Sequence, residues 1–150
     1  MRTMKSRKVT RHYCDFCKKS GGRQPQMETH EKHCTLNPNR ECRMCKIVES
    51  EQFEVVELIA ALPNPKDYGE VGPTGKGTVY VGLDEAINSA ILVLREKSNN
   101  CPMCILAALR QSGIIPAISI HAFDYKAEVE RFWKEKNEED RRQDDFEACH

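Results

Sequence analysis

Long apolar runs are missing from this chain of 150 residues, and its opening stretch MRTMKSRKVTRH holds no apolar segment of signal-peptide length. We therefore expect neither a membrane span nor export, which places the protein in the cytoplasm, or in the host cytoplasm if it is viral. The eight cysteines should stay reduced there. Paired C-x-x-C motifs in a reducing compartment indicate metal binding in preference to disulfide formation.

Aromatic residues are few, with a single tryptophan, and the formal net charge is zero. A chain of this length can build one ordinary core, or two small modules of which at least one needs a staple. The zero net charge hides an asymmetry, because residues 1–46 carry twelve Lys and Arg against four Asp and Glu, while the remainder is acidic. A basic head predicts an anionic partner, unless it folds back onto its own acidic body.

Recognisable catalytic patterns are also missing. The histidines outside the cysteine-rich region, His12, His121 and His150, belong to no nucleophile or nuclease motif. The stretch GPTGKGT (72–78) lacks the spacing of a phosphate-binding loop and leads into the strand-like TVYV instead of a helix. We therefore expect neither an enzyme nor a nucleotide-binding protein.

The first cysteine pair predicts a metal site. Cys14 and Cys17 form a C-x2-C knuckle, in which two thiolates on a tight turn chelate one tetrahedral zinc. His30 and Cys34 follow at i and i+4, so on a helix both project toward the same ion. His33 would lie about 100° around that helix, and we expect it at the surface. The predicted first site is therefore Cys14, Cys17, His30 and Cys34.

The spacing C-x2-C-x12-H-x3-C over residues 14–34 resembles a CCHC variant of the ββα zinc finger. Tyr13 fits the family pattern, and Met27 stands where the family usually has a leucine. The stretch HEKHCTLNPNR is similar to the end of zinc fingers in phage-encoded proteins associated with DNA. Gly21 replaces the family's aromatic core residue, so zinc must supply most of the folding energy of the finger.

The resemblance also implies a DNA contact. If the groove-reading positions of the family carry over, Arg23, Gln26 and Thr29 face the bases, and Arg23 reaches a guanine. The basic residues around the finger would hold the phosphates. These candidate phosphate contacts are Arg2, Lys5, Arg7, Lys8, Arg11, Lys18, Lys19 and Arg23.

The four remaining paired cysteines, Cys42-x2-Cys45 and Cys101-x2-Cys104, predict a second zinc site with four thiolates and no open position for a substrate. Three alternatives stay open. An iron–sulfur cluster could use the same four cysteines, and CPMC could act as a redox dithiol. Ligands could also be exchanged, with Cys34 joining the second site and His33 replacing it in the first. Cys149 and His150 are left over as spectators.

Beyond the finger the pattern is helical. Apolar residues recur at helical spacing over 49–62, and Pro63 and Pro65 stop that helix. Asp84 is placed to cap a helix that buries Ile87, Ala90, Ile91 and Leu94. Another helix begins at Cys101–Pro102 and ends at Gly113. The apolar run 114–120 predicts an edge strand or buried loop. Asp124 is placed to cap a last helix.

These signals predict a mainly α protein with a small β content, built from zinc-stapled modules. Its expected parts are a basic arm (1–12), a CCHC finger (13–40), a helical module stapled by the two C-x-x-C pairs (41–137) and a charged tail (138–150). We expect a non-enzymatic zinc protein that binds nucleic acid through arm and finger, as a phage or bacterial regulatory or accessory protein. In that role the helical module recruits a protein partner. The alternatives are a protein–protein adaptor whose zincs only stabilise the fold, and an iron–sulfur or redox protein.

Overall fold

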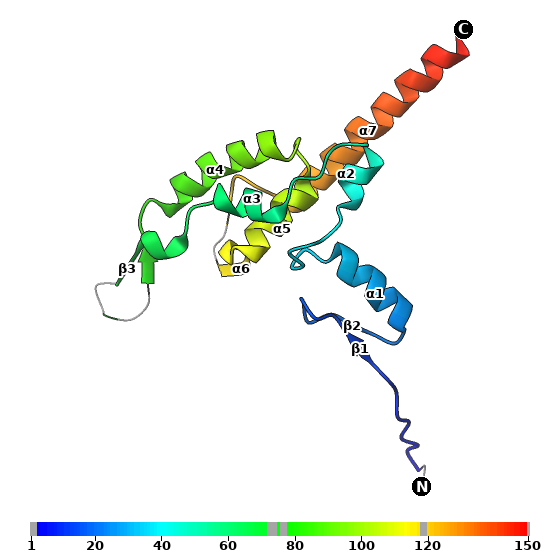
Figure 1. Ribbon diagram of the computed structural model, residues 1–150, viewed down its shortest axis with the longest axis vertical. Coiled ribbons are helices and arrows are strands. Elements are labelled where there is room, and N and C mark those ends of the chain that lie inside the picture. The colour runs from blue at the N-terminus through cyan, green and yellow to red at the C-terminus, as the bar shows by residue number, and fades with distance from the viewer. Residues whose placement is uncertain (1–2, 72–74, 76–77, 118–119, 150) are drawn as a thin grey trace.

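The N-terminal part of the protein is a ββα unit (Figure 1). Strand β1 (His12–Tyr13) pairs antiparallel with β2 (Ser20–Gly21), and helix α1 (Gln24–His33) follows. The structure is a computed structural model, and it describes residues 3–71, 75, 78–117 and 120–149. Arg2 and His150, together with most of the GPTGKGT loop, lie outside the described residues.

The rest of the chain is mainly helical. Helix α2 (Arg43–Ile47) and helix α3 (Val55–Ala60) lead to the 3-10 turn η1 (Pro65–Asp67) and to a hairpin of β3 (Gly69–Val71) and β4 (Thr78–Tyr80). Helices α4 (Leu83–Lys97), α5 (Pro102–Gln111), α6 (Ile114–Ala117) and α7 (Tyr125–Ala148) complete the order. The expected mainly α class with small β content is confirmed.

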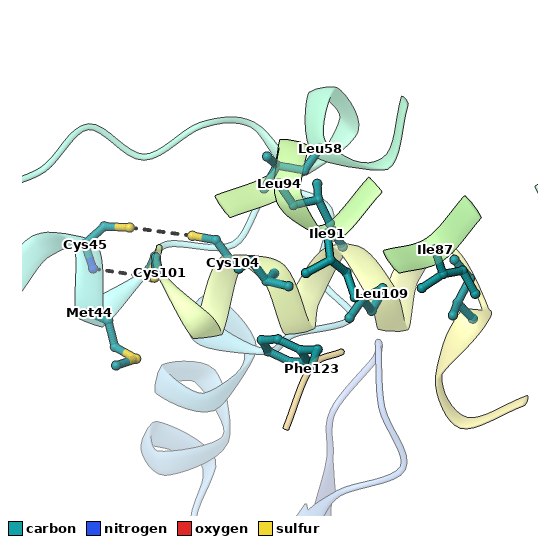
Figure 2. Close-up of a cluster of buried hydrophobic side chains, with 14 of the residues drawn as sticks. Met44, Cys45, Leu58, Ile87, Ile91, Leu94, Cys101, Cys104, Leu109 and Phe123 are labelled. Atoms are coloured by element: carbon teal, nitrogen blue, oxygen red, sulfur yellow. Dashed lines mark hydrogen bonds between the residues drawn. The ribbon is translucent and has the colours of Figure 1, made fainter. Parts of the chain in front are cut away.

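Helix α5 lies at the centre of the helical part, where α3, α4, α6 and α7 all contact it. Its sequence PMCILAALRQ is apolar around most of its circumference, as expected for a helix covered on several sides. Figure 2 shows the result, with Leu109 of α5 below Leu94 and Ile91 of α4, and Phe123 on another side of α5. The second cysteine group closes one end of this core.

Helix α7 begins at the cap that the sequence predicts, because the Asp124 carboxylate accepts hydrogen bonds from the backbone N–H groups of Lys126 and Ala127. Its first turns pack on the core through Tyr125 and Phe132. The helix then continues to Ala148, so residues 138–148, expected as a charged tail, are helical. In Figure 1 this end projects away from the body, on the side opposite the N-terminus.

Three expectations about individual elements were wrong. The helix expected over 49–62 spans only 55–60, because the Gln52 side chain bonds the backbone at Arg40 and Cys42 and holds the preceding segment extended. Helix α4 is capped by Gly82, whose positive φ of 75° favours glycine, and Asp84 lies in its first turn. Part of the apolar run 114–120, expected as an edge strand or buried loop, forms the short helix α6 with one non-helical residue, Ile115.

Candidate metal centres

The two predicted ligand sets each come together in space. Cys14, Cys17, His30 and Cys34 form one group, and their donor atoms all lie within 4.8 Å of one another. The remaining paired cysteines form a second group of the same tightness, made up of Cys42, Cys45, Cys101 and Cys104. The sequence partition is thus reproduced by the geometry, and the described residues form two metal-capable clusters.

Backbone turns shape the knuckle of the first centre. The Cys14 N–H donates to the Lys19 carbonyl at 2.9 Å, which closes the turn, and the Phe16 N–H points at the Cys14 Sγ at 3.4 Å. The Asp15 N–H donates to the Glu31 carboxylate on α1 at 3.0 Å, so the knuckle is tied to the helix that carries His30. Cys17 Sγ then lies 3.2 Å from His30 Nε2. This imidazole nitrogen therefore faces the thiols.

Cys34 stands at the C-terminal cap of α1, where its side chain is buried. The Glu31 carbonyl near the helix end accepts from the Cys34 N–H at 3.3 Å and from the Asn37 side-chain amide at 2.7 Å. This cap bends the chain so that the fourth donor turns toward the knuckle. The small core beneath consists of Cys14, Met27 and Cys34, with Leu36 against it, which agrees with a finger that needs metal to fold.

His33 has a different role from His30. Its Nδ1 lies 2.9 Å from the Glu41 carbonyl oxygen, so its ring holds the segment that leads from the finger to the second centre. Neither Cys34 nor His33 is exchanged between the centres, because Cys34 belongs to the first group and His33 to neither. The ligand-exchange alternative is therefore wrong for this structure.

The surroundings of the first centre shift the pKa values of its donors in different directions. Burial and the nearby Lys19 ammonium lower the pKa of His30, which keeps its imidazole neutral and able to ligate. Burial raises the pKa of the Cys34 thiol to about 11. Burial also tends to raise the pKa of Cys17, but hydrogen bonds with Lys19, Cys14 and Cys34 outweigh it, so the pKa of Cys17 is lowered overall. A divalent cation would replace the thiol protons at this centre.

Two similar knuckles build the second centre. Cys42 is the N-cap of α2 and Cys101 the N-cap of α5, so in both pairs the second cysteine lies in the first turn of a helix. The Cys42 Sγ lies 3.5 Å from Cys101 Sγ, and the Cys45 Sγ lies 3.5 Å from Cys104 Sγ, a pair drawn in Figure 2. Four sulfurs around one zinc at a bond length of about 2.3 Å are separated by about 3.8 Å. The observed spacing fits one ion.

All four cysteines of the second centre are buried, with exposures of 2% to 4%. Hydrogen bonds from Cys101, Cys104 and Cys45 lower the pKa of Cys42, whereas the same crowding raises the pKa of Cys104. Several thiolates in one buried group repel one another, so full deprotonation requires a cation among them. Burial also removes Cys101 and Cys104 from thiol exchange with other proteins, which disfavours the redox-dithiol alternative.

A buried cation adjoins the second centre. Arg40 is 3% exposed, and its three guanidinium nitrogens have no hydrogen-bond partner among the described residues. The Gln52 side chain bonds both the Arg40 carbonyl and the Cys42 N–H, so this arginine is fixed beside the knuckle. Burial raises the pKa of Tyr125, the charge of Arg40 lowers it, and the charge of Cys42 raises it. Four thiolates with one divalent ion carry a charge of −2, which a buried guanidinium offsets.

The structure also shows residues that the sequence did not single out. Gln111 of α5 donates to the carbonyls of Thr35 and Asn37, each at 2.9 Å, and Arg110 donates to the Thr35 hydroxyl. These bonds attach the exit of the finger to the helical module. No periodicity or spacing marks Gln52, Arg40, Arg110 or Gln111, because each works through a contact between segments that are distant in sequence.

The predicted nucleic-acid residues are exposed where the structure describes them. Lys5, Arg7 and Lys8 lie on the extended arm, and Arg11 donates to the Ser20 hydroxyl at 3.2 Å. Lys18, Lys19, Arg23 and Gln26 are exposed on the finger. Arg23 is the N-cap of α1, and Gln26 shares a cleft with helix α5. Arg2 lies outside the described residues.

No protein-family model matches the chain, and neither the curated proteins nor the solved structures give a significant match. Within the described ranges, no helix combines the length and the apolar character that crossing a membrane requires.

Proposed function

We propose that the protein is a non-enzymatic, zinc-dependent nucleic-acid-binding protein. Zinc suits both clusters, because a tetrahedral set of three cysteines and one histidine, or of four cysteines, is typical of structural zinc. When filled, each centre has four protein donors and no position for a substrate. An iron–sulfur cluster would spread the four thiolates over several irons, which calls for some sulfur pairs farther apart than the 4.8 Å that bounds this group.

The metal assignment is tested by metal analysis of the purified full chain. Two zinc ions per chain and a colourless solution are expected. Iron in the sample, together with an absorbance band at about 400 nm, would instead establish the iron–sulfur alternative.

The observation that carries the nucleic-acid proposal is the position of the basic arm. The arm runs outward from the finger in Figure 1, away from the helical module. Among the described residues the ion pairs are Arg95–Glu128 and Lys136–Asp140, and neither involves an arm or finger cation. The arm therefore does not fold back onto Glu49, Glu51, Glu54 or Glu57, and its charge is available to an anionic partner.

The experiment is a titration of a labelled oligonucleotide with the zinc-loaded protein, followed by fluorescence anisotropy at several salt concentrations, with and without chelator. Binding should weaken as the salt concentration rises. A plot of the logarithm of the binding constant against the logarithm of the salt concentration should have a slope of about −5 if about six phosphates are neutralised. Chelation should weaken binding because it unfolds the finger. Binding that does not change with salt would contradict the proposal.

The regulatory or accessory role in phage or bacterial DNA metabolism implied by the resemblance stays a prediction.

A protein–protein adaptor is the second candidate, and helix α7 favours it. Trp133 is 38% exposed on this projecting helix, with its ring edge-on to Phe132 at a centroid distance of 5.4 Å. An exposed tryptophan on a charged helix is a common anchor for a protein partner. If the zinc-loaded protein binds no oligonucleotide at low salt, the adaptor function replaces the first proposal.

A further inference from the structure

A cleft of about 460 Å³ lies where the finger meets the helical module. We name it the junction cleft. One wall comes from the knuckle and helix α1 of the finger, and the other from α2, α5 and the start of α7. Arg110 and Gln111 of α5 bond Thr35 at the exit of the finger and so hold the two walls against each other.

The charge of the junction cleft is one-sided. Lys19, Arg43 and Arg110 line it, and the lining contains neither aspartate nor glutamate. A filled first centre, with three thiolates, a neutral imidazole and a divalent ion, carries a charge of −1, so the three cations leave a net charge of +2. The Arg43 and Lys19 side chains make no hydrogen bond or ion pair within the part of the chain that the structure describes. They are free to bind an anion.

The wall formed by the helical module also has an apolar part beside Arg43 and Arg110. Met103 and Leu106 of α5 are half-buried there, and the Tyr125 ring joins them, with its hydroxyl 3.2 Å from the Met103 sulfur. Cations beside an aromatic and apolar wall are the composition of sites that hold single-stranded nucleic acid, because phosphates meet the charges and bases stack on the wall.

The position of α1 argues against a duplex in the same place. A finger helix reads DNA from within the major groove, which is about 12 Å wide. Here Gln26 and Thr29, two of the three residues expected to face bases, share the cleft with Leu106 and Arg110 of α5, whereas Arg23 does not line it. A duplex on this face of α1 would meet α5, whereas a single strand can enter the space between them.

We propose that the junction cleft binds a single-stranded segment of nucleic acid, with its phosphates on Lys19, Arg43 and Arg110 and a base against Tyr125. This inference deepens the proposed nucleic-acid function and rests on it. It also gives the helical module a direct part in binding, in addition to the arm and finger.

The test compares Arg43→Gln with Lys46→Gln in the full-length, zinc-loaded protein. Both residues are exposed on α2, but only Arg43 lines the cleft. With a labelled oligothymidylate, Arg43→Gln should weaken binding about fivefold and reduce the salt slope by about 0.7, the value for one phosphate contact of a single strand. Lys46→Gln should stay within about twofold of the unsubstituted protein. Equal effects of the two substitutions would overturn the proposal.

A second measurement does not depend on the variants. An oligonucleotide that carries 5-iodouracil crosslinks to aromatic side chains on irradiation, and mass spectrometry locates the site. A crosslink to Tyr125 is expected. Crosslinks confined to Tyr13 and Phe16 of the finger would contradict the cleft as the binding site.

The failure of this inference can be told apart from the failure of the proposed function. If a Lys5, Arg7 and Lys8→Gln variant weakens binding and Arg43→Gln does not, the protein binds nucleic acid but not in the cleft. If the unsubstituted protein binds neither oligothymidylate nor a duplex at low salt, the proposed function is itself wrong.

Discussion

Cys42 and Cys101 are 59 positions apart in the chain, yet their sulfur atoms lie 3.5 Å from each other. This contact joins the N-termini of α2 and α5 and closes one end of the main core. The second centre is therefore also part of the hydrophobic core, and loss of its metal should affect the whole helical module.

The first prediction concerns this coupling. Cys101→Ser should reduce the zinc content from two ions to one and destabilise the helical module, because three donors and an unpaired buried hydroxyl remain. Cys149→Ser, at the exposed C-cap of α7, is the matched control and should keep two zinc ions. Metal analysis and thermal unfolding measure both effects. Unchanged zinc content in Cys101→Ser would remove Cys101 from the ligand set.

The second prediction separates the ligands of the finger. Cys34→Ser should lose one zinc and unfold residues 13–34, whereas His33→Ala should keep both ions, because His33 Nδ1 contacts the Glu41 carbonyl instead of the metal group. Amide hydrogen exchange over the finger and zinc analysis provide the readouts. A greater loss of zinc in His33→Ala than in Cys34→Ser would show that the donor partition is wrong.

The third prediction concerns Arg40, which is buried without a hydrogen-bond partner among the described residues. Arg40→Met should weaken zinc retention at the second centre, because a buried cation that offsets the −2 charge is lost. The metal-free protein should be no less stable with methionine, since an unpaired buried charge is costly. Competition with a chromogenic chelator measures zinc retention, and urea unfolding of the metal-free protein measures stability. Equal zinc retention in both proteins would show that Arg40 does not serve the site.

The fourth prediction uses the ion pair that attaches α7 to α4. Arg95 donates to both carboxylate oxygens of Glu128, and this lowers the pKa of Glu128. A lowered folded-state pKa means that the pair stabilises the fold above the unfolded value of about 4.3, and that this contribution is lost as pH falls through the folded value. Glu128→Gln should therefore cost about 1–2 kcal/mol at neutral pH, and less as the pH drops below about 4.

Urea unfolding as a function of pH, taken as the difference between Glu128→Gln and the unsubstituted protein, tests this. The subtraction removes the effect of acid on the metal centres, which both proteins share. Asp140→Asn, which breaks the more exposed Lys136–Asp140 pair, should change stability by less than about 0.5 kcal/mol. If the difference for Glu128→Gln stays constant down to acid pH, the pair does not contribute as described.

The fifth prediction tests the core around α5. Leu109 is fully buried between helices, so Leu109→Ala should cost about 2–5 kcal/mol of unfolding free energy. Leu92 is 65% exposed on α4, and Leu92→Ala should cost less than about 0.5 kcal/mol. Urea unfolding of the zinc-loaded protein measures both. Similar losses at the two positions would contradict the placement of α5 at the centre.

The sequence by itself determined the donor sets and most of the helix faces, and its resemblance to zinc fingers implied the ββα order. Knuckle spacing and i, i+4 spacing are local geometry, so Cys14, Cys17, His30 and Cys34 could be grouped without coordinates. The buried face of α4 and the Asp124 cap are local signals of the same kind.

Only the tertiary structure decided what surrounds these donors. Gln52 shortens α3 by bonding the chain ten residues before it, Arg40 is buried beside the second centre, and Arg110 with Gln111 attaches the finger to α5. These interactions join segments with no periodic relation in sequence. Their free energy depends on packing that exists only in the folded chain, and for that reason the junction cleft has no sequence signature.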